Sequence, residues 1–374
     1  MPISAVDAIT PAFQHMKKQL IQPFRFGQWV RLAVVGFLAG ELSSGGGCNS
    51  GGFNFPTPQQ HPRGSEQFLG FGPSWPPELV NHPAMLAGLI AFLIVAGLVF
   101  IVLFTYISSV MRFILFDSIV AKECHIRDGW VRRQSEGFRL FVWQILLMLA
   151  TFAVLIILVG LPLAIAWSAG WFKQPSAHIL PLVLGGILLF FLFMALILIM
   201  AVVHVMTKDF VVPQMALEGI SAMEGWRRLW PRVSGEKGGY AGYIGMKIVM
   251  AIGAGIVFGI ITVIVMLVLL IPIGGVGVVA VLGGKAAGMT WNLYTITLAV
   301  VVGCVALAIL IFAISLISVP VAVFFPAYSI YFFAARYPKL AALLWPPPPA
   351  QPVAVAPPRP PEPPPLPPTP VLIG

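Results

Sequence analysis

Long stretches without charge restrict this fold more than any other feature of the sequence. Residues 140–171 contain no charged side chain, and residues 84–116 contain only Arg112. Each stretch exceeds the roughly 20 residues that a helix needs to cross the hydrocarbon core of a bilayer. A soluble domain cannot bury so much apolar surface, because 59% of the residues are hydrophobic and only 9% are charged. The sequence therefore predicts a chain embedded in a membrane.

The expected fold class is all-α. A helix satisfies its backbone hydrogen bonds internally when it lies in lipid, and these stretches lack the period-two alternation of a membrane β-barrel. We predict a polytopic transmembrane helical bundle of about six spans, arranged as three helical hairpins with interfacial connecting helices. The predicted spans lie near residues 27–42, 85–112, 141–168, 180–206, 248–271 and 298–326.

Composition divides the chain into a membrane domain, residues 1–340, and two segments of other character. Residues 43–83 are rich in Gly, Pro, Ser and Asn and are predicted to form a flexible extracytoplasmic loop. Residues 345–374 are rich in proline, which favours extended polyproline II and not helix. We predict that they form a disordered cytoplasmic tail, which suits either a proline-recognising protein partner or a passive spacer.

The distribution of charge predicts the orientation. If the short first span, residues 27–42, crosses, the side with both termini holds 19 of the 22 Lys and Arg residues and ten of the 13 acidic residues. Glu41 then falls on the opposite side. The positive-inside rule places both termini in the cytoplasm, and the whole formal charge of +9 faces that leaflet. Such a surface attracts anionic lipid headgroups, although topology alone also explains the excess.

The two long cytoplasmic connections resemble each other at an offset of 96 residues. One is FILFDSIVAKECHIRDGWVRR, from Phe113, and the other is DFVVPQMALEGISAMEGWRRL, from Asp209. Each contains an acidic residue, Gly and Trp, followed by a basic pair. We predict that these residues contact lipid headgroups or the membrane interface: Arg132, Arg133, Arg227, Arg228, Trp130 and Trp226. The alternative is a structural elbow between hairpins.

A helix start is predicted within the second connection. Ser221 and Glu224 have the spacing of a capping box, in which the serine side chain binds a free backbone N–H of the first turn. Pro231 is expected to end this helix about two turns later.

Few side chains in the spans offer chemistry. His204 and Lys247 lie at the ends of predicted spans, and Asp117 and Asp209 lie just beyond them. Each can reach the interface, although an ionisable group at membrane depth is also a candidate functional residue. No His, Cys, Asp or Glu set has metal-ligand spacing, so we predict no catalytic residue, metal or cofactor. We expect no nucleic-acid partner, since topology accounts for the basic residues.

The segments FVVPQMALEGISAMEGWRRLWP and PFRFGQWVRLAVVGFLAG resemble a family of uncharacterised bacterial six-helix integral membrane proteins. That family is similar to the membrane domain attached to some glycerophosphodiester phosphodiesterases. The resemblance covers roughly residues 10–340 and implies a multi-pass protein of the bacterial cytoplasmic (inner) membrane. It transfers no catalytic residue, because the soluble phosphodiesterase barrel and its metal ligands are absent from the matching region.

Together these features favour a non-catalytic membrane protein that organises membrane lipids, expected to be anionic, or a protein partner at the cytoplasmic leaflet. The alternative is a transporter or channel for a small solute, because many transporters are built from repeats. An enzyme would need converging polar groups, which the sequence does not display.

Overall fold

The computed structural model describes residues 3–41, 83–172, 175–286 and 293–345, and in these ranges the regular structure is entirely helical. The predicted loop 43–83 and tail 345–374 lie outside the described residues, apart from Pro83 and Trp345 at their edges. The elements are α1 (Ile9–Leu20), α2 (Phe26–Leu38), α4 (Pro83–Ala121), α5 (Ile126–Ser168), the 3₁₀ turn η2 (Pro175–His178), α6 (Ile179–Met206), the π-helical turn η3 (Thr207–Val211), α7 (Val212–Glu218), α8 (Ala222–Gly235), α9 (Lys237–Ala286), α10 (Leu293–Ala334) and α11 (Pro338–Leu344).

Within the described part of the chain, five helical segments are long and apolar enough to cross a membrane. They are α4, α5, α6 with its continuation through α7, α9 and α10. The most apolar stretch of each is almost wholly exposed in the isolated chain. Apolar surface of this length and exposure is what lipid covers. The described part of the chain is therefore all-helical, and it has the character of a multi-pass membrane protein.

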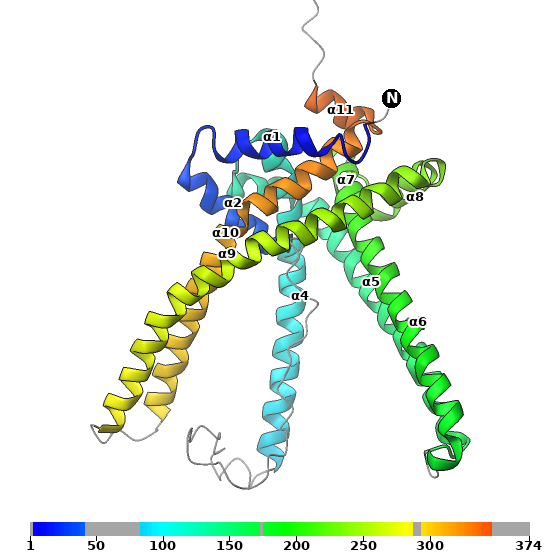
Figure 1. Cartoon of the computed structure of the whole chain (residues 1–374), viewed down its shortest axis with the longest axis vertical. Helices are drawn as coiled ribbons and strands as arrows, with labels where there is room; N and C mark the ends of the chain where they lie inside the picture. The colour runs from blue at the N-terminus through cyan, green and yellow to red at the C-terminus, as the bar shows by residue number, and fades with distance from the viewer. Residues whose placement is uncertain (1–2, 42–82, 173–174, 287–292, 346–374) are drawn as a thin grey trace, which may run out of the picture.

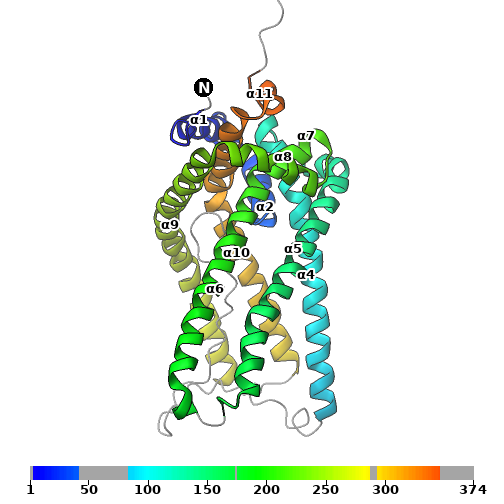
Figure 2. The same cartoon turned by 90° about the vertical axis from the view of Figure 1, so that its right-hand side faces the viewer.

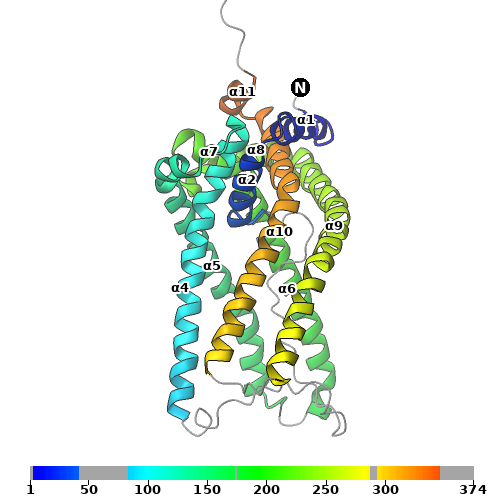
Figure 3. The same cartoon turned by 90° about the vertical axis from the view of Figure 1, so that its left-hand side faces the viewer.

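Helices at one end of the molecule form a platform, from which the long helices diverge (Figure 1). We use the name platform for α1, α2, η3, α7, α8, α11 and the ends of the long helices that pack on them. The legs are the remaining parts of α4, of the α5–α6 pair and of the α9–α10 pair. Figures 2 and 3 show α1 and α11 at the same end of the long helices in two further views. The first and last described helices therefore lie together.

The described part of the predicted first span is a short helix in the structure. Helix α2 has 13 residues, which gives a length of about 20 Å against a hydrocarbon core of about 30 Å. It packs on α4 and α10 in the platform. Glu41, just beyond it, is 2% exposed and pairs with Lys208 of η3 across 2.5 Å. The charge count assigned Glu41 to the far side, whereas the structure places it in the platform beside η3; the crossing of residues 27–42 stays a prediction.

A cluster of aromatic side chains forms the centre of the platform. Phe210, Tyr243 and Phe332 are completely buried, and the Tyr243 ring lies 4.6 Å from Phe332 and 5.1 Å from Phe210. Tyr243 also stacks on Tyr328 at 5.0 Å. Close aromatic pairs of this kind add about 0.5–1.5 kcal/mol each beyond their area burial. The packed core thus lies at one end of the molecule, and it fixes the platform ends of α9 and α10.

The two predicted interfacial connections have different forms. The first comprises the end of α4, a short turn and the beginning of α5, which continues without a break into the leg. The second contains a separate helix, α8, whose predicted cap is confirmed because Ser221 Oγ accepts from the Glu224 N–H at 3.3 Å. The prediction that Pro231 ends this helix is wrong, since α8 continues to Gly235. Pro231 is exposed, so water can bind the carbonyl that its missing N–H leaves unbonded.

Helix α1 is held to the platform through His15. This side chain is 5% exposed; its Nε2 lies 2.9 Å from the Ile119 carbonyl oxygen, and its Nδ1 lies 3.2 Å from the Tyr331 hydroxyl. A neutral ring that donates from Nε2 and accepts at Nδ1 satisfies both contacts. Burial lowers the pKa of His15 below its usual 6.5, and the nearby Lys122 acts in the same direction.

We expect the stability of the protein to fall as the pH drops below about 6.5, because the unfolded chain then takes up a proton that folded His15 resists. Replacing His15 with Gln removes this titration. Melting temperatures measured between pH 5 and 8 should therefore fall more steeply toward acid for the wild type than for His15→Gln. Parallel curves for the two proteins would rule out His15 as the source.

Candidate functional site

The first pair of predicted headgroup residues lies beside an acidic residue of the platform. Arg133 forms a two-pronged contact with Asp117, with Nη2 2.8 Å from Oδ1 and Nε 2.8 Å from Oδ2. Arg132 reaches the same carboxylate at 2.8 Å. The side chain of Arg133 is 14% exposed and that of Arg132 is 65% exposed. Arg133 thus ties α5 to α4, whereas Arg132 remains accessible.

The second pair also contacts carboxylates. Arg228 pairs with Glu218 and Glu224, and Arg227 pairs with Glu224 at 3.2 Å. The Arg227 side chain is 81% exposed, and exposed ion pairs contribute little to stability, typically about 0–1 kcal/mol. Arg227 therefore remains available at the surface of the platform.

The two tryptophans that were predicted to contact lipid headgroups or the membrane interface are partly buried in the platform. Trp130 packs edge-on against Tyr106 at 6.1 Å, and Trp226 donates from Nε1 to Thr207 Oγ1 at 3.1 Å. Each therefore makes a specific contact within the protein.

A separate group of charged side chains converges around η3. This π-helical turn places Lys208, which is partly buried, and Asp209, which is buried, at consecutive positions between α6 and α7. Lys208 pairs with Glu41, as described above. Asp209 pairs with Lys247 of α9 and also accepts a hydrogen bond of 2.9 Å from the Tyr243 hydroxyl. π-Helical turns inside long helices frequently occur at functional sites.

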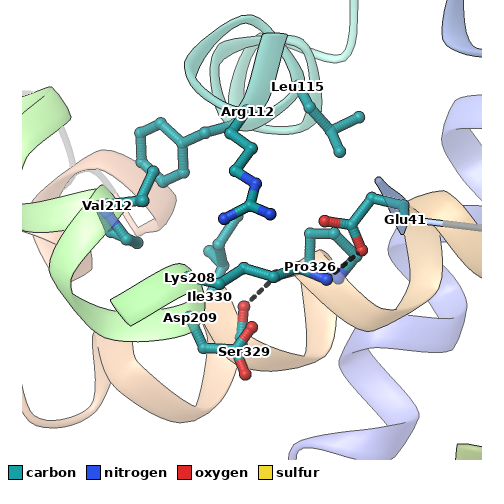
Figure 4. Close-up of a pocket in the computed structure, with 11 residues that line it drawn as sticks. Glu41, Arg112, Leu115, Lys208, Asp209, Val212, Pro326, Ser329 and Ile330 are labelled. Atoms are coloured by element: carbon teal, nitrogen blue, oxygen red, sulfur yellow. Dashed lines mark hydrogen bonds and ion pairs between the residues drawn. The ribbon is translucent and has the colours of Figure 1, made fainter. Parts of the chain in front are cut away.

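Arg112 of α4 adds a third cation to this group. Its Nε donates to the Ala39 carbonyl at 3.2 Å, and its Nη2 lies 3.5 Å from His204 Nε2. Among the described residues, no carboxylate oxygen lies within 4.0 Å of the Arg112 guanidinium nitrogens. Figure 4 shows its guanidinium directed into the space between Glu41 and Asp209.

We name this group the η3 cluster and define it by its charged members and the histidine beside them. It consists of Glu41, Arg112, His204, Lys208, Asp209 and Lys247. Three cations face two carboxylates, so the cluster carries one excess positive charge when His204 is neutral. An excess charge among largely buried side chains is costly unless an anion or water compensates it. The chemistry that this arrangement favours is anion binding.

Open space reaches the η3 cluster in three places. The central cavity among Glu41, Arg112 and Asp209 measures about 30 Å³, which holds about one or two water molecules. A groove of about 240 Å³, lined by Lys208 and Lys247, lies between α6 and α9. A third space of about 620 Å³ lies between α4, α5 and α6 and includes Arg112 and His204. Only the two larger spaces admit a group bigger than water.

Sequence reasoning identified His204, Asp209 and Lys247 one at a time but not the cluster that they form. One usable signal was present, because Arg112 is the single charge in residues 84–116. The pairing of Lys208 with Glu41, across 167 positions, had no local signature. Within the described residues, no three His, Cys, Asp or Glu side chains lie close enough to hold a metal ion.

The chain matches one model in a comparison with protein families. That model is described as "Family of unknown function (DUF7544)", and the match extends over residues 3–343. No curated protein and no solved structure matches the chain. The comparisons show no link to glycerophosphodiester phosphodiesterases, so that part of the resemblance stays a prediction.

Proposed function

The chain belongs to the DUF7544 family of unknown function, and we propose that it is a non-catalytic multi-pass membrane protein that gathers anionic phospholipid. In this proposal it lies in the bacterial cytoplasmic (inner) membrane, with the platform and both termini on the cytoplasmic side. The lipid collects at the cytoplasmic leaflet, around the platform ends of the long helices.

The basic residues support this orientation. Arg112, Lys208 and Lys247 lie near the platform ends of α4, α6 and α9, at the boundary between the apolar legs and the polar platform. Exposed Arg132 and Arg227 lie on the platform itself. By the positive-inside rule this end faces the cytoplasm.

The observation that carries the proposal is the excess positive charge of the η3 cluster. Arg112 is partly exposed and not paired with any carboxylate of the described residues. At the depth where a long apolar helix meets the headgroup region, the abundant anion is a phospholipid phosphate. Binding such a group satisfies guanidinium donors and offsets the excess charge.

Local lipid composition tests the proposal. The protein is reconstituted in phosphatidylcholine membranes with a minority of phosphatidylglycerol and excised with its surrounding lipid by an amphipathic polymer. We expect the excised discs to hold a larger share of phosphatidylglycerol than the parent membrane, because the platform attracts the anionic lipid. Equal shares in discs and parent membrane would refute the proposal.

A double variant distinguishes, in the same experiment, the lipid enrichment due to exposed platform residues from that due to the η3 cluster. Combining Arg132→Ala with Arg227→Ala removes two exposed cations, each worth about 1 kcal/mol of attraction to anionic lipid. We expect a partial loss of the enrichment, with the remainder due to the cluster.

The alternative function is a transporter or channel for a small solute, and η3 is the observation that favours it. Transporters commonly bind their substrates where a membrane helix is interrupted, and here the interruption holds Lys208 and the buried Asp209. Proteoliposomes loaded with a pH-sensitive dye distinguish the two functions. Proton flux that exceeds that of empty liposomes and is lost in Asp209→Asn would favour transport.

A further inference from the structure

We propose that the space between α4, α5 and α6, which we name the α4–α5 groove, binds a single anionic phospholipid of the cytoplasmic leaflet. The lipid phosphate lies on Arg112, and one acyl chain follows α5 toward the leg end. This inference rests on the proposed function and deepens it by assigning one lipid to one site.

Polar side chains gather at the platform end of the α4–α5 groove. Arg112 and His204 line it, and so do Ser108 and Gln144. Gln144 accepts a hydrogen bond of 2.9 Å from Ser109 through Oε1, which leaves the two amide hydrogens of Gln144 outside that bond. Guanidinium, amide and hydroxyl groups are all hydrogen-bond donors. This end of the groove therefore suits a phosphate.

Mostly apolar side chains line the rest of the groove in the direction of the legs, and the hydroxyls of Thr105 and Thr151 there donate to carbonyls of their own helices. On α5 these are Met148, Phe152 and Leu155, and Met200 of α6 faces them. From Gln144 to Leu155 the chain advances 11 residues, or about 16 Å of helix. That length is close to half of the roughly 30 Å hydrocarbon core, which is the depth of one leaflet.

The directions of the helices place Arg112, His204 and Gln144 at the same end. Helices α4 and α6 run toward the platform, so Arg112 and His204 lie nearer to it than Phe104 and Met200 (Figure 2). Helix α5 runs away from the platform, so Gln144 is nearer to it than Leu155. The groove is thus polar at the depth of the headgroups and apolar at the depth of the acyl chains.

The α4–α5 groove fits this lipid better than the groove between α6 and α9. The cations of the latter, Lys208 and Lys247, already pair with Glu41 and Asp209. Arg112 has no such pair among the described residues, and its planar guanidinium can bind two phosphate oxygens at once. Met148 and Phe152 are 58% and 60% exposed, so a lipid can enter from the side.

Native mass spectrometry of the full chain tests the platform end of the α4–α5 groove, with phosphatidylglycerol as the probe. Wild-type protein extracted from mixed phosphatidylcholine and phosphatidylglycerol membranes should retain one phosphatidylglycerol molecule. Arg112→Gln should weaken this retention by roughly tenfold or more, because the charge-assisted phosphate contact is lost. Arg127→Gln removes an exposed cation in the first turn of α5, about 25 Å of helix before Gln144, and should retain the lipid as the wild type does.

A second pair of variants tests the apolar part of the α4–α5 groove without changing Arg112. Met148→Trp adds bulk to the groove wall, whereas Leu149→Trp adds the same bulk at a neighbouring residue that is 59% exposed and does not line the groove. We expect lipid retention to fall only in Met148→Trp. Excess inorganic phosphate should not displace the lipid, since the acyl chain contributes to binding.

Equal retention by Met148→Trp and Leu149→Trp, or by Arg112→Gln and Arg127→Gln, would overturn this inference. The proposed function would survive that outcome if the discs were still enriched in phosphatidylglycerol, because lipid would then gather without this site. Absence of enrichment in the wild-type discs would instead refute the proposed function itself.

Discussion

Replacing Asp209 with Asn is expected to lower the free energy of unfolding by about 3–5 kcal/mol, the usual cost of breaking one side of a buried ion pair. The Asp209 side chain is 1% exposed and holds both Lys247 and the Tyr243 hydroxyl. Asparagine keeps the shape of the side chain but removes its charge. Lys247 then remains as an unpaired cation at a site that is nearly closed to water.

Thermal unfolding in detergent measures this loss of stability, and two further variants serve as comparisons. Asp128→Asn changes an exposed aspartate in the first turn of α5 and should cost less than about 1 kcal/mol. Adding Lys247→Met to Asp209→Asn should recover part of the loss, because no unpaired charge is then buried. Similar melting temperatures for Asp209→Asn and Asp128→Asn would contradict the role given to this pair.

Replacing Gly137 with Ala is expected to destabilise the protein by about 1–3 kcal/mol through overpacking. A Cβ atom at Gly137 would lie 2.5 Å from Val110 Cγ2 and 2.9 Å from Val110 Cα. The second of these atoms belongs to the backbone of α4, so α4 and α5 would have to separate. Because Arg112 lies two residues beyond Val110, the same separation should disturb the platform end of the α4–α5 groove.

Gly160 provides the matched control on the same helix. Its nearest neighbour for an added Cβ is Ile156 Cγ2 at 4.0 Å, an ordinary contact. Gly160→Ala should leave stability unchanged or raise it by up to about 1 kcal/mol, because alanine favours helix more than glycine does. If Gly137→Ala melted at or above the temperature of Gly160→Ala, the close approach of α4 and α5 would not be needed for stability.

The long helices were predictable because their signal is local. An uncharged stretch such as residues 140–171 indicates a membrane helix without reference to the rest of the chain. The η3 cluster was not predictable in the same way, since Glu41, Arg112 and Lys247 come from separate helices and meet only after the platform has packed. The position of Glu41 was not predictable for a related reason. Counting charges treats each one as exposed, whereas Glu41 is buried against Lys208.

The repeated acidic-Gly-Trp segments illustrate a second limit. Their glycines pack closely on the preceding helical segments: an added Cβ would lie 3.2 Å from Ile114 at Gly129 and 2.7 Å from Val211 at Gly225. Their basic pairs fold back onto Asp117 and onto Glu218 with Glu224. These contacts show that each repeated segment packs its helix against the helical segment that precedes it. The exposed Arg132 and Arg227 keep the predicted headgroup contact testable. Sequence patterns alone do not distinguish the two roles, because both require a small residue, an aromatic ring and basic side chains.

The central claim is that the protein prefers anionic phospholipid at its surface, and electron spin resonance of spin-labelled lipids tests it most directly. Purified protein is reconstituted in phosphatidylcholine with a trace of spin-labelled phosphatidylglycerol or spin-labelled phosphatidylcholine. The account predicts a larger motionally restricted fraction for labelled phosphatidylglycerol, reduced by added salt because salt screens exposed charges. Equal restricted fractions for the two labels at low salt would contradict it.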